Sequence, residues 1–261
     1  MSESVLLSVE EGIATLSFNR AQVFNAMDAE MMVQFRASAE RVERDSGVRA
    51  VVLRGEGKAF IAGGDVGLFH RHIAELPETI VRWGREMHFG ILALRRMAKP
   101  VLASVQGACA GAGFSILCAC DLAIAAEDAR FSLAYANIGA SPDGGSTHFL
   151  PRLLGYKKAM ELTLLPELFG ADVAKHLGLV NWVAPAGELA QHTARIARRL
   201  ASGPTLAHGE AKRLLQDSPE RSIETQMELE LMAFARCART RDLAEGVAAF
   251  VEKRKPVFRG E

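Results

Sequence analysis

Apolar and polar positions along the chain change their periodicity in an ordered way. The runs 5–9 and 13–18 are short and rich in β-forming residues, and a glycine-bearing turn at 10–12 separates them, which predicts a hairpin. From Asp28, a residue type that favours helix N-caps, apolar residues recur at helical spacing until Gly47. Residues 48–53 then form a continuous apolar run of strand length. The N-terminal part is therefore predicted as a strand pair, a helix and a buried strand.

The order of helix followed by strand returns twice. Helical spacing extends from about residue 78 to residue 97 and precedes an apolar strand at 101–105. A shorter helix at 112–120 leads to a strand at 122–125. Strands that alternate with helices, several of them continuously apolar, indicate an α/β architecture whose sheets are covered on their faces.

The C-terminal third has a different pattern. Strand signals stop after Pro185, and what remains is helical spacing. We therefore expect a helical appendage on an α/β core. The predicted helices are 188–200, 205–216, 223–237 and 242–253.

Composition narrows the classes of function. Thirty-one Lys and Arg residues balance 31 Asp and Glu residues in 261, so the chain has no basic field that would favour nucleic acid as a partner. No segment reaches the roughly 18 uninterrupted apolar residues of a membrane span, and no signal-peptide pattern begins the chain. These features predict a cytoplasmic protein without a membrane partner. The four cysteines lack zinc-like spacing, so no metal site is expected.

Three glycine-rich segments follow predicted strands, at 60–65, 107–113 and 141–146. The second lacks both the GxGxxG spacing and the Lys-Ser/Thr pair of nucleotide-binding loops. It runs into a helix, where unpaired backbone N–H groups form an anion site. A second free N–H from the turn at 63–64 would complete an oxyanion hole. Both segments are equally compatible with simple tight turns.

The order and spacing of several motifs resemble one family over essentially the whole chain. The chain is similar to the crotonase (enoyl-CoA hydratase/isomerase) superfamily. The motifs are the opening hairpin with 18–20 and 25–27, the segment 58–65, the segment from Lys99-Pro100 through Gly107 to Asp121, then 178–180, 203–204 and 250–255.

That resemblance implies an architecture, an assembly and a substrate. Residues 1–195 would form a spiral core of repeated ββα units with the acyl-CoA site, and residues 196–261 a helical trimerisation region. The expected assembly is a homotrimer or a hexamer made from two trimers. The substrate would be an acyl-CoA thioester, and coenzyme A would enter as part of it, without a separate cofactor. The family's oxyanion donors map onto the N–H groups of Gly64 and Ala112.

The resemblance also implies where the thioester lies. The segment 69–86 shapes the acyl pocket in this family. A basic cluster beginning at Lys253 resembles the part of the last helix that holds the nucleotide, although taken alone it is typical of a solvated helix end. The adenine end would lie near Gln22, Val23, Phe24, Ala62, Gly63, Asp65 and Val66, and the acyl part near Ala108, Ala110, Gly111, Tyr135 and Ile138.

The acid/base groups differ from those of the family's hydratases. Ser115 and Tyr135 stand at the positions of the two hydratase glutamates, and neither can act as a carboxylate base. Asp143 remains. Its segment resembles that of peroxisomal-type enoyl-CoA isomerases, dienoyl-CoA isomerases and the ring-epoxide isomerases of phenylacetate degradation. We therefore predict an isomerase in which Asp143 moves a proton within an apolar pocket, with Phe114 and Phe149 as further walls.

Other interpretations of Asp143 stay open. It fits a turn or a cap for a helix from Ser146. The family's 4-chlorobenzoyl-CoA dehalogenases use an aspartate here as nucleophile and carry a histidine at the position of His88. They have a tryptophan at the position of Tyr135, however, and an aromatic residue at the position of Gly64. For His88 we expect a helix residue lining the acyl pocket. A hydratase with non-standard acid/base residues and a catalytically silent acyl-CoA-binding subunit are the remaining alternatives.

Overall fold

The computed structural model of the chain describes residues 3–261. Its strands are β1 (Val5–Glu10), β2 (Ile13–Phe18), β3 (Ala50–Gly55), β4 (Val101–Val105), β5 (Ala108–Ala110), β6 (Leu122–Ala126), β7 (Arg130–Ser132), β8 (Phe169–Gly170) and β9 (Trp182–Ala184). Its α-helices are α1 (Ala29–Arg44), α2 (Val66–Arg71), α3 (Leu76–Arg96), α4 (Ala112–Ala119), α5 (Ser146–Leu154), α6 (Tyr156–Leu164), α7 (Ala171–His176), α8 (Leu189–Ala201), α9 (Thr205–Asp217), α10 (Ile223–Cys237) and α11 (Arg241–Val251). Short 3-10 helices are η1 (Ala21–Val23), η2 (Ile73–Glu75), η3 (Tyr135–Ile138), η4 (Ala186–Glu188) and η5 (Ser218–Glu220).

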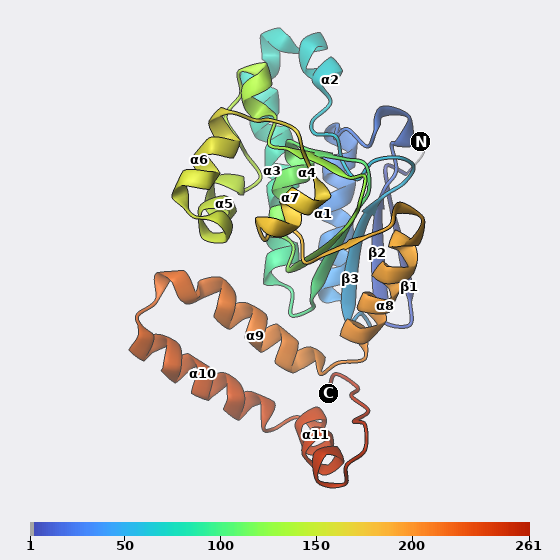
Figure 1. Cartoon of the computed structure of the whole chain (residues 1–261), viewed down its shortest axis with the longest axis vertical. Helices are drawn as coiled ribbons and strands as arrows, with labels where there is room; N and C mark the ends of the chain where they lie inside the picture. Colours follow the sequence, from blue (N-terminus) through green and yellow to red (C-terminus); the bar gives the residue numbers. More distant parts are fainter. Residues whose placement is uncertain (1–2) are drawn as a thin grey trace.

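The main sheet has six strands in the order β1-β2-β3-β4-β6-β9. Strands β1 and β2 form the predicted antiparallel hairpin, and the later neighbours pair in parallel. Helices α1 and α3 lie side by side along one face, and α8 covers the other (Figure 1). Alternate side chains of β3 point to opposite faces of the sheet. Val51 and Leu53 belong to the large core under α1 and α3, whereas Val52 packs in the cluster under α8. This confirms the α/β class.

A second sheet, β5-β7-β8, gives the chain its repeating path. Each of β4 and β6 in the main sheet is followed by a strand of the second sheet, β5 and β7, and then by helical structure. After β3 the corresponding place is taken by residues 61–64, where bridges join Ile61 to Cys109 and Gly64 to Met27. The chain therefore winds through repeated ββα units, as expected.

For most of these elements, the bounds predicted from local sequence patterns agree with the observed bounds to within a few residues. Asp28 caps α1 as predicted, because its Oδ1 accepts a hydrogen bond from the Met31 N–H at 2.9 Å. The strand predicted at 48–53 begins two residues later, since the Val48 N–H is used in a turn with the Asp45 carbonyl. The small helices α2, α6 and α7 were not predicted, because each is short and its apolar residues do not form a sustained helical stripe. The strands β5, β7, β8 and β9 were not predicted either, because each has only two or three residues.

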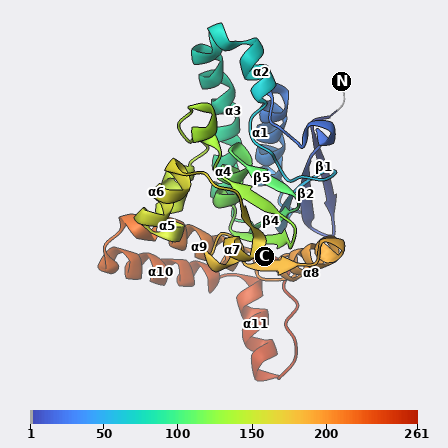
Figure 2. The ribbon, with the colours of Figure 1, turned by 45° about the horizontal axis from the view of Figure 1, so that its top comes forward.

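The C-terminal helices α9, α10 and α11 extend away from the sheet, and α11 projects furthest (Figures 1 and 2). Helix α8 belongs to the core, because Ala197 is buried in the cluster that it forms with the sheet. The boundary expected between residues 195 and 196 falls inside this helix, which ends at Ala201. None of the helices within residues 3–261 has both the length and the apolar character needed to cross a lipid bilayer.

Candidate active site

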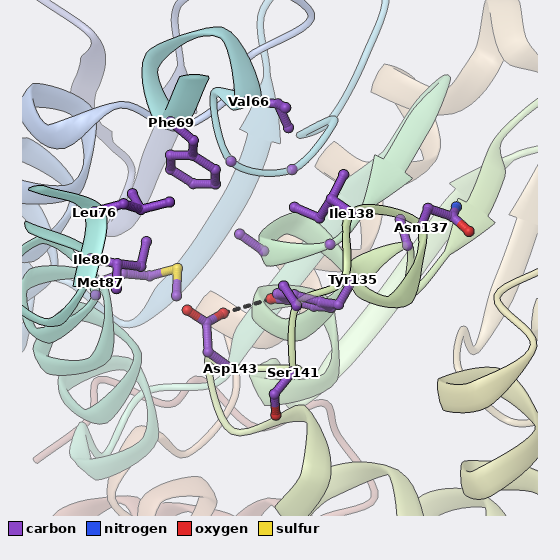
Figure 3. Close-up of a pocket in the computed structure, with 18 of the residues that line it drawn as sticks. Val66, Phe69, Leu76, Ile80, Met87, Tyr135, Asn137, Ile138, Ser141 and Asp143 are labelled. Atoms are coloured by element: carbon purple, nitrogen blue, oxygen red, sulfur yellow. Dashed lines mark hydrogen bonds between the residues drawn. The ribbon is translucent and has the colours of Figure 1, made fainter. Parts of the chain in front are cut away.

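A cavity of about 620 Å³ opens between the α2–α3 segment and η3 (Figure 3). Residues 69–86 contribute much of its wall, as the resemblance implied. Among the residues that line it within 3–261, Asp143 is the one with a charged side chain. The cavity is thus an apolar space with a single carboxylate. Its apolar wall includes Met32, Phe69, Leu76, Ile80, Met87 and Ile138.

Gly64 and Ala112, the predicted oxyanion donors, line this cavity. Met27 bridges the residues on either side of Gly64, since its N–H bonds to the Gly63 carbonyl at 2.8 Å and its carbonyl accepts from Asp65 at 2.9 Å. The N–H of Gly64 therefore points away from Met27. Ala112 is the first residue of α4, where backbone N–H groups lack an intrahelical acceptor. Across the described residues, neither N–H is hydrogen-bonded.

Glycines bring the two N–H groups together. A Cβ on Gly111 would lie 3.4 Å from the Cα of Gly63, so these two backbones are in direct contact. A Cβ on Gly113 would lie 2.3 Å from the Ile61 carbonyl oxygen, which no side chain tolerates. The first turn of α4 can reach the 61–64 strand because of this glycine. Gly64 and Ala112, the residues that follow these contacts, thereby line one cavity.

Asp143 enters the cavity from the turn between η3 and α5. Its Oδ1 accepts a hydrogen bond from the Tyr135 hydroxyl at 2.6 Å (Figure 3). Helix α5 uses the main-chain carbonyl of Asp143, which accepts from the Ser146 N–H at 3.3 Å and its hydroxyl at 3.1 Å. The side chain therefore does not cap α5, and the cap interpretation is wrong. Burial, with the neighbouring Asp143 carboxylate as the next cause, raises the pKa of Tyr135, so its hydroxyl stays protonated and donates.

The turn after Asp143 rests against the helix position where hydratases carry a glutamate. Gly144 has a φ of +62°, and a Cβ on it would lie 2.8 Å from the Ser115 Cβ. On its other side, Ser115 contacts Tyr135: the serine Oγ lies 3.1 Å from the Tyr135 hydroxyl oxygen. The serine and the aspartate-bearing turn therefore occupy the space that a longer side chain at residue 115 would need.

We expect Ser115→Glu to lose the isomerase activity that the sequence resemblance implies and to gain no hydratase activity. The larger buried side chain would displace Gly144 or Tyr135, and overpacking of this kind destabilises by about 1–3 kcal/mol. Thermal unfolding and assays of both reactions measure the outcome, with Ser115→Ala as the control for loss of the hydroxyl alone. A stable Ser115→Glu enzyme that hydrates 2-enoyl-CoA would contradict this account.

Three expectations about the pocket are wrong. Phe114 is fully buried and packs edge-on against Phe169, because it lies on the face of α4 opposite the cavity. Phe149 lies under the Arg95 guanidinium, 5.1 Å from its ring centre, on the far side of the turn. His88 also lies behind the turn, where its Nε2 accepts from the Gly144 N–H at 3.2 Å. It supports the turn from outside and does not line the acyl cavity.

Several predicted contacts of the acyl-CoA thioester lie together in the cavity. Ala62, Gly63 and Val66 line the cavity, as do Gly111, Tyr135 and Ile138 further in. The Ala62 N–H donates to the Phe24 carbonyl at 3.0 Å, which holds the loop of Gln22, Val23 and Phe24 beside the mouth. The side chains of these three loop residues are exposed.

The other predicted contacts lie elsewhere. The Asp65 carboxylate caps α2 through the Leu68 N–H and pairs with Arg20 at 3.1 Å, so it has a structural use. Ala108 and Ala110 belong to β5 and do not line the cavity. Lys253 follows α11, and α11 lies at the opposite end of the molecule from α2 (Figure 1). Within one chain, these four residues are not brought to the cavity.

Comparison with known proteins agrees with this geometry. The enoyl-CoA hydratase/isomerase family model matches residues 8–261. The chain belongs to the enoyl-CoA hydratase/isomerase family. It is therefore an acyl-CoA enzyme of the crotonase superfamily, which confirms the resemblance seen in the sequence.

Relatives within the enoyl-CoA hydratase/isomerase family have different activities. The 1,2-epoxyphenylacetyl-CoA isomerase of Escherichia coli strain K12 is 34% identical, with all of both chains aligned. The 4-chlorobenzoyl coenzyme A dehalogenase-2 of an Arthrobacter species is 33% identical over 95% of this chain and 91% of its own. The crystal structure of an enoyl-CoA hydratase from Polaromonas sp. JS666 superposes with a TM-score of 0.93 at 33% identity, covering 98% and 99% of the two chains. Family membership thus defines the scaffold and leaves the reaction to the site residues.

Proposed function

We propose that this protein is an enoyl-CoA isomerase that shifts a double bond through a thioester enolate. The N–H groups of Gly64 and Ala112 would stabilise the enolate oxygen. Asp143 would take a proton from one carbon of the acyl chain and return it to another. No water is added in these reaction steps, and no second carboxylate is required.

One observation carries the proposal: among residues 3–261, Asp143 is the one carboxylate that lines the cavity, together with Gly64 and Ala112, whose N–H groups have no hydrogen-bond partner in that range. Water addition to an enoyl thioester needs one group to activate water and another to handle the α-proton. The positions of the two hydratase glutamates hold Ser115 and Tyr135. A reversible proton transfer is therefore the chemistry that these residues support best.

The cavity also favours an apolar acyl group. No Lys, Arg or His residue lines it in the part of the chain that the structure describes. A carboxylate on the acyl chain would lose its hydration without gaining a partner and would face Asp143. We therefore expect unsubstituted or carbocyclic enoyl groups to be preferred over dicarboxylic monothioesters.

Wild-type protein incubated separately with 3-enoyl-CoA, 2-enoyl-CoA and 2,4-dienoyl-CoA thioesters tests the proposal, with products separated by chromatography. We expect interconversion of double-bond isomers and no 3-hydroxyacyl product. Hydration of 2-enoyl-CoA would instead identify a hydratase with unusual acid/base residues. Binding without turnover of any of these thioesters would identify a silent acyl-CoA-binding subunit, and either result would overturn the isomerase proposal.

The dehalogenase alternative has less support. His88 lies behind the turn that follows Asp143, and its Nε2 accepts a hydrogen bond from the Gly144 N–H. The family's dehalogenases carry an aromatic residue at the position of Gly64. Here a Cβ on Gly64 would lie 2.7 Å from the Phe69 ring, so that space is already filled. Release of chloride from 4-chlorobenzoyl-CoA would be the result that favours it.

We further propose that the C-terminal helices assemble the protein into a trimer or a dimer of trimers. The support is a set of exposed apolar side chains on these helices, a pattern typical of interfaces. Light scattering should give a mass of three or six 28.2 kDa chains, and Phe234→Glu should reduce it. A wild-type monomer at micromolar concentration would exclude this assembly. The exposed side chains are Leu206, Leu215, Ile223, Met227, Leu231, Phe234 and Phe250.

A further inference from the structure

A chain of hydrogen bonds runs from Asp143 into the protein. The Tyr135 hydroxyl lies 2.6 Å from the Asp143 Oδ1 and 3.1 Å from the Ser115 Oγ. The Ser115 Oγ in turn lies 3.4 Å from the Gly111 carbonyl oxygen. The residues at both hydratase glutamate positions therefore form one series with the aspartate.

The directions of these bonds follow from the number of protons. A phenol has one proton, and in the bond to Asp143 it is donated to Oδ1. Tyr135 must then accept from Ser115, whose hydroxyl also has one proton. That proton is therefore not available to the Gly111 carbonyl oxygen, which lies 3.4 Å away. Ser115 is fully buried and does not line the cavity. The series therefore ends inside the protein. A proton on Asp143 cannot pass to solvent through Tyr135 and Ser115.

The second carboxylate oxygen is in a different environment. Oδ2 is turned toward Met87 and Ile80 of α3, on the side of the cavity (Figure 3). A Cβ on Gly84, which also lines the cavity, would lie 3.9 Å from this oxygen. The absence of a side chain at Gly84 leaves room for substrate beside Oδ2. The two oxygens of Asp143 are therefore not equivalent.

We propose that Tyr135 is a positioning residue that makes Oδ2 of Asp143 the single proton carrier of the reaction. This inference rests on the proposed isomerase function. Oδ2 takes the proton from one carbon as the C–H bond breaks, and the electron pair passes to the thioester enolate. The same oxygen then returns the proton to another carbon, and the double bond reforms at its new position. Tyr135 keeps its own proton throughout.

Other titratable and charged groups approach the turn from behind and do not reach the carboxylate. His88 bonds to the Gly144 N–H, and Arg95 stacks on Phe149. Tyr135 is the side chain that bonds to the carboxylate among residues 3–261. The groups that share the depression behind Gly144 and Gly145 are His88 and Arg95 from α3, His148 from α5, Asp217 at the end of α9 and Glu220 of η5.

Tyr135→Phe tests the inference, with Tyr156→Phe as the matched control, because Tyr156 is the chain's other tyrosine and is exposed on α6. We expect Tyr135→Phe to lower kcat for isomerisation about 10- to 100-fold, with KM within about twofold of wild type. The acidic limb of the kcat/KM–pH profile should move to higher pH, because a carboxylate that has lost a donor binds its proton more readily. Tyr156→Phe should leave both quantities unchanged.

Ser115→Ala provides a second test if Tyr135→Phe does not fold, as judged by circular dichroism. It should move the acidic limb in the same direction by a smaller amount, although residue 115 does not contact the cavity. Wild-type kcat and an unmoved acidic limb in both variants would overturn the role of Tyr135. That result would leave the isomerase proposal intact as long as Asp143→Asn is inactive, so the two failures are distinguishable.

Discussion

Asp143→Asn is expected to lower kcat for double-bond isomerisation about a thousandfold and to leave KM nearly unchanged. Positioned acid/base groups contribute about 10²- to 10⁴-fold to rate, and an amide neither accepts nor returns the substrate proton at neutral pH. Asparagine has the shape of aspartate, and its Oδ1 still accepts from the Tyr135 hydroxyl. The turn and the cavity should therefore persist, so that the loss falls on the chemical step.

Steady-state assays on a 3-enoyl-CoA thioester measure this effect, and thermal unfolding checks the fold. Asp128→Asn is the matched control, because Asp128 is exposed in the turn before β7, away from the cavity. It should have wild-type kcat. An Asp143→Asn enzyme that isomerises within about tenfold of the wild-type rate would remove Asp143 from the mechanism.

Ala112→Pro should lower kcat about 10²- to 10³-fold, the usual cost of losing one oxyanion donor. Proline has no N–H, so the substitution deletes the proposed donor itself, which no ordinary side-chain change does. Ala112 is the first residue of α4, where proline is well accommodated because that N–H has no intrahelical acceptor. The helix should form, and the enolate oxygen should lose one of its two partners.

Ala29→Pro offers the control for introducing proline at the start of a helix. Ala29 is the first residue of α1, and Asp28 before it has the extended conformation that precedes proline readily. Ala29→Pro should retain full activity and a similar unfolding temperature. If Ala112→Pro is folded and as active as Ala29→Pro, the N–H of Ala112 is not an oxyanion donor.

Local patterns were sufficient for much of the secondary structure. Helix α10 begins and ends where helical spacing predicted, and β4 coincides with the apolar run 101–105. Hydrophobic periodicity and capping residues are properties of neighbouring positions, so a single sequence contains them. The positions of Gly64, Ala112 and Asp143 came from resemblance, because none of their motifs is specific alone.

What the sequence determined by itself was the α/β class, the family, and the replacement of two glutamates by Ser115 and Tyr135. Tertiary structure decided that these two residues bond in series to Asp143, that His88 lies behind the turn, and that α8 belongs to the core. The physical reason is that side-chain direction depends on partners distant in the chain. Residues 115, 135 and 143 come from three elements, and their contact exists once α4, η3 and the turn before α5 are packed together.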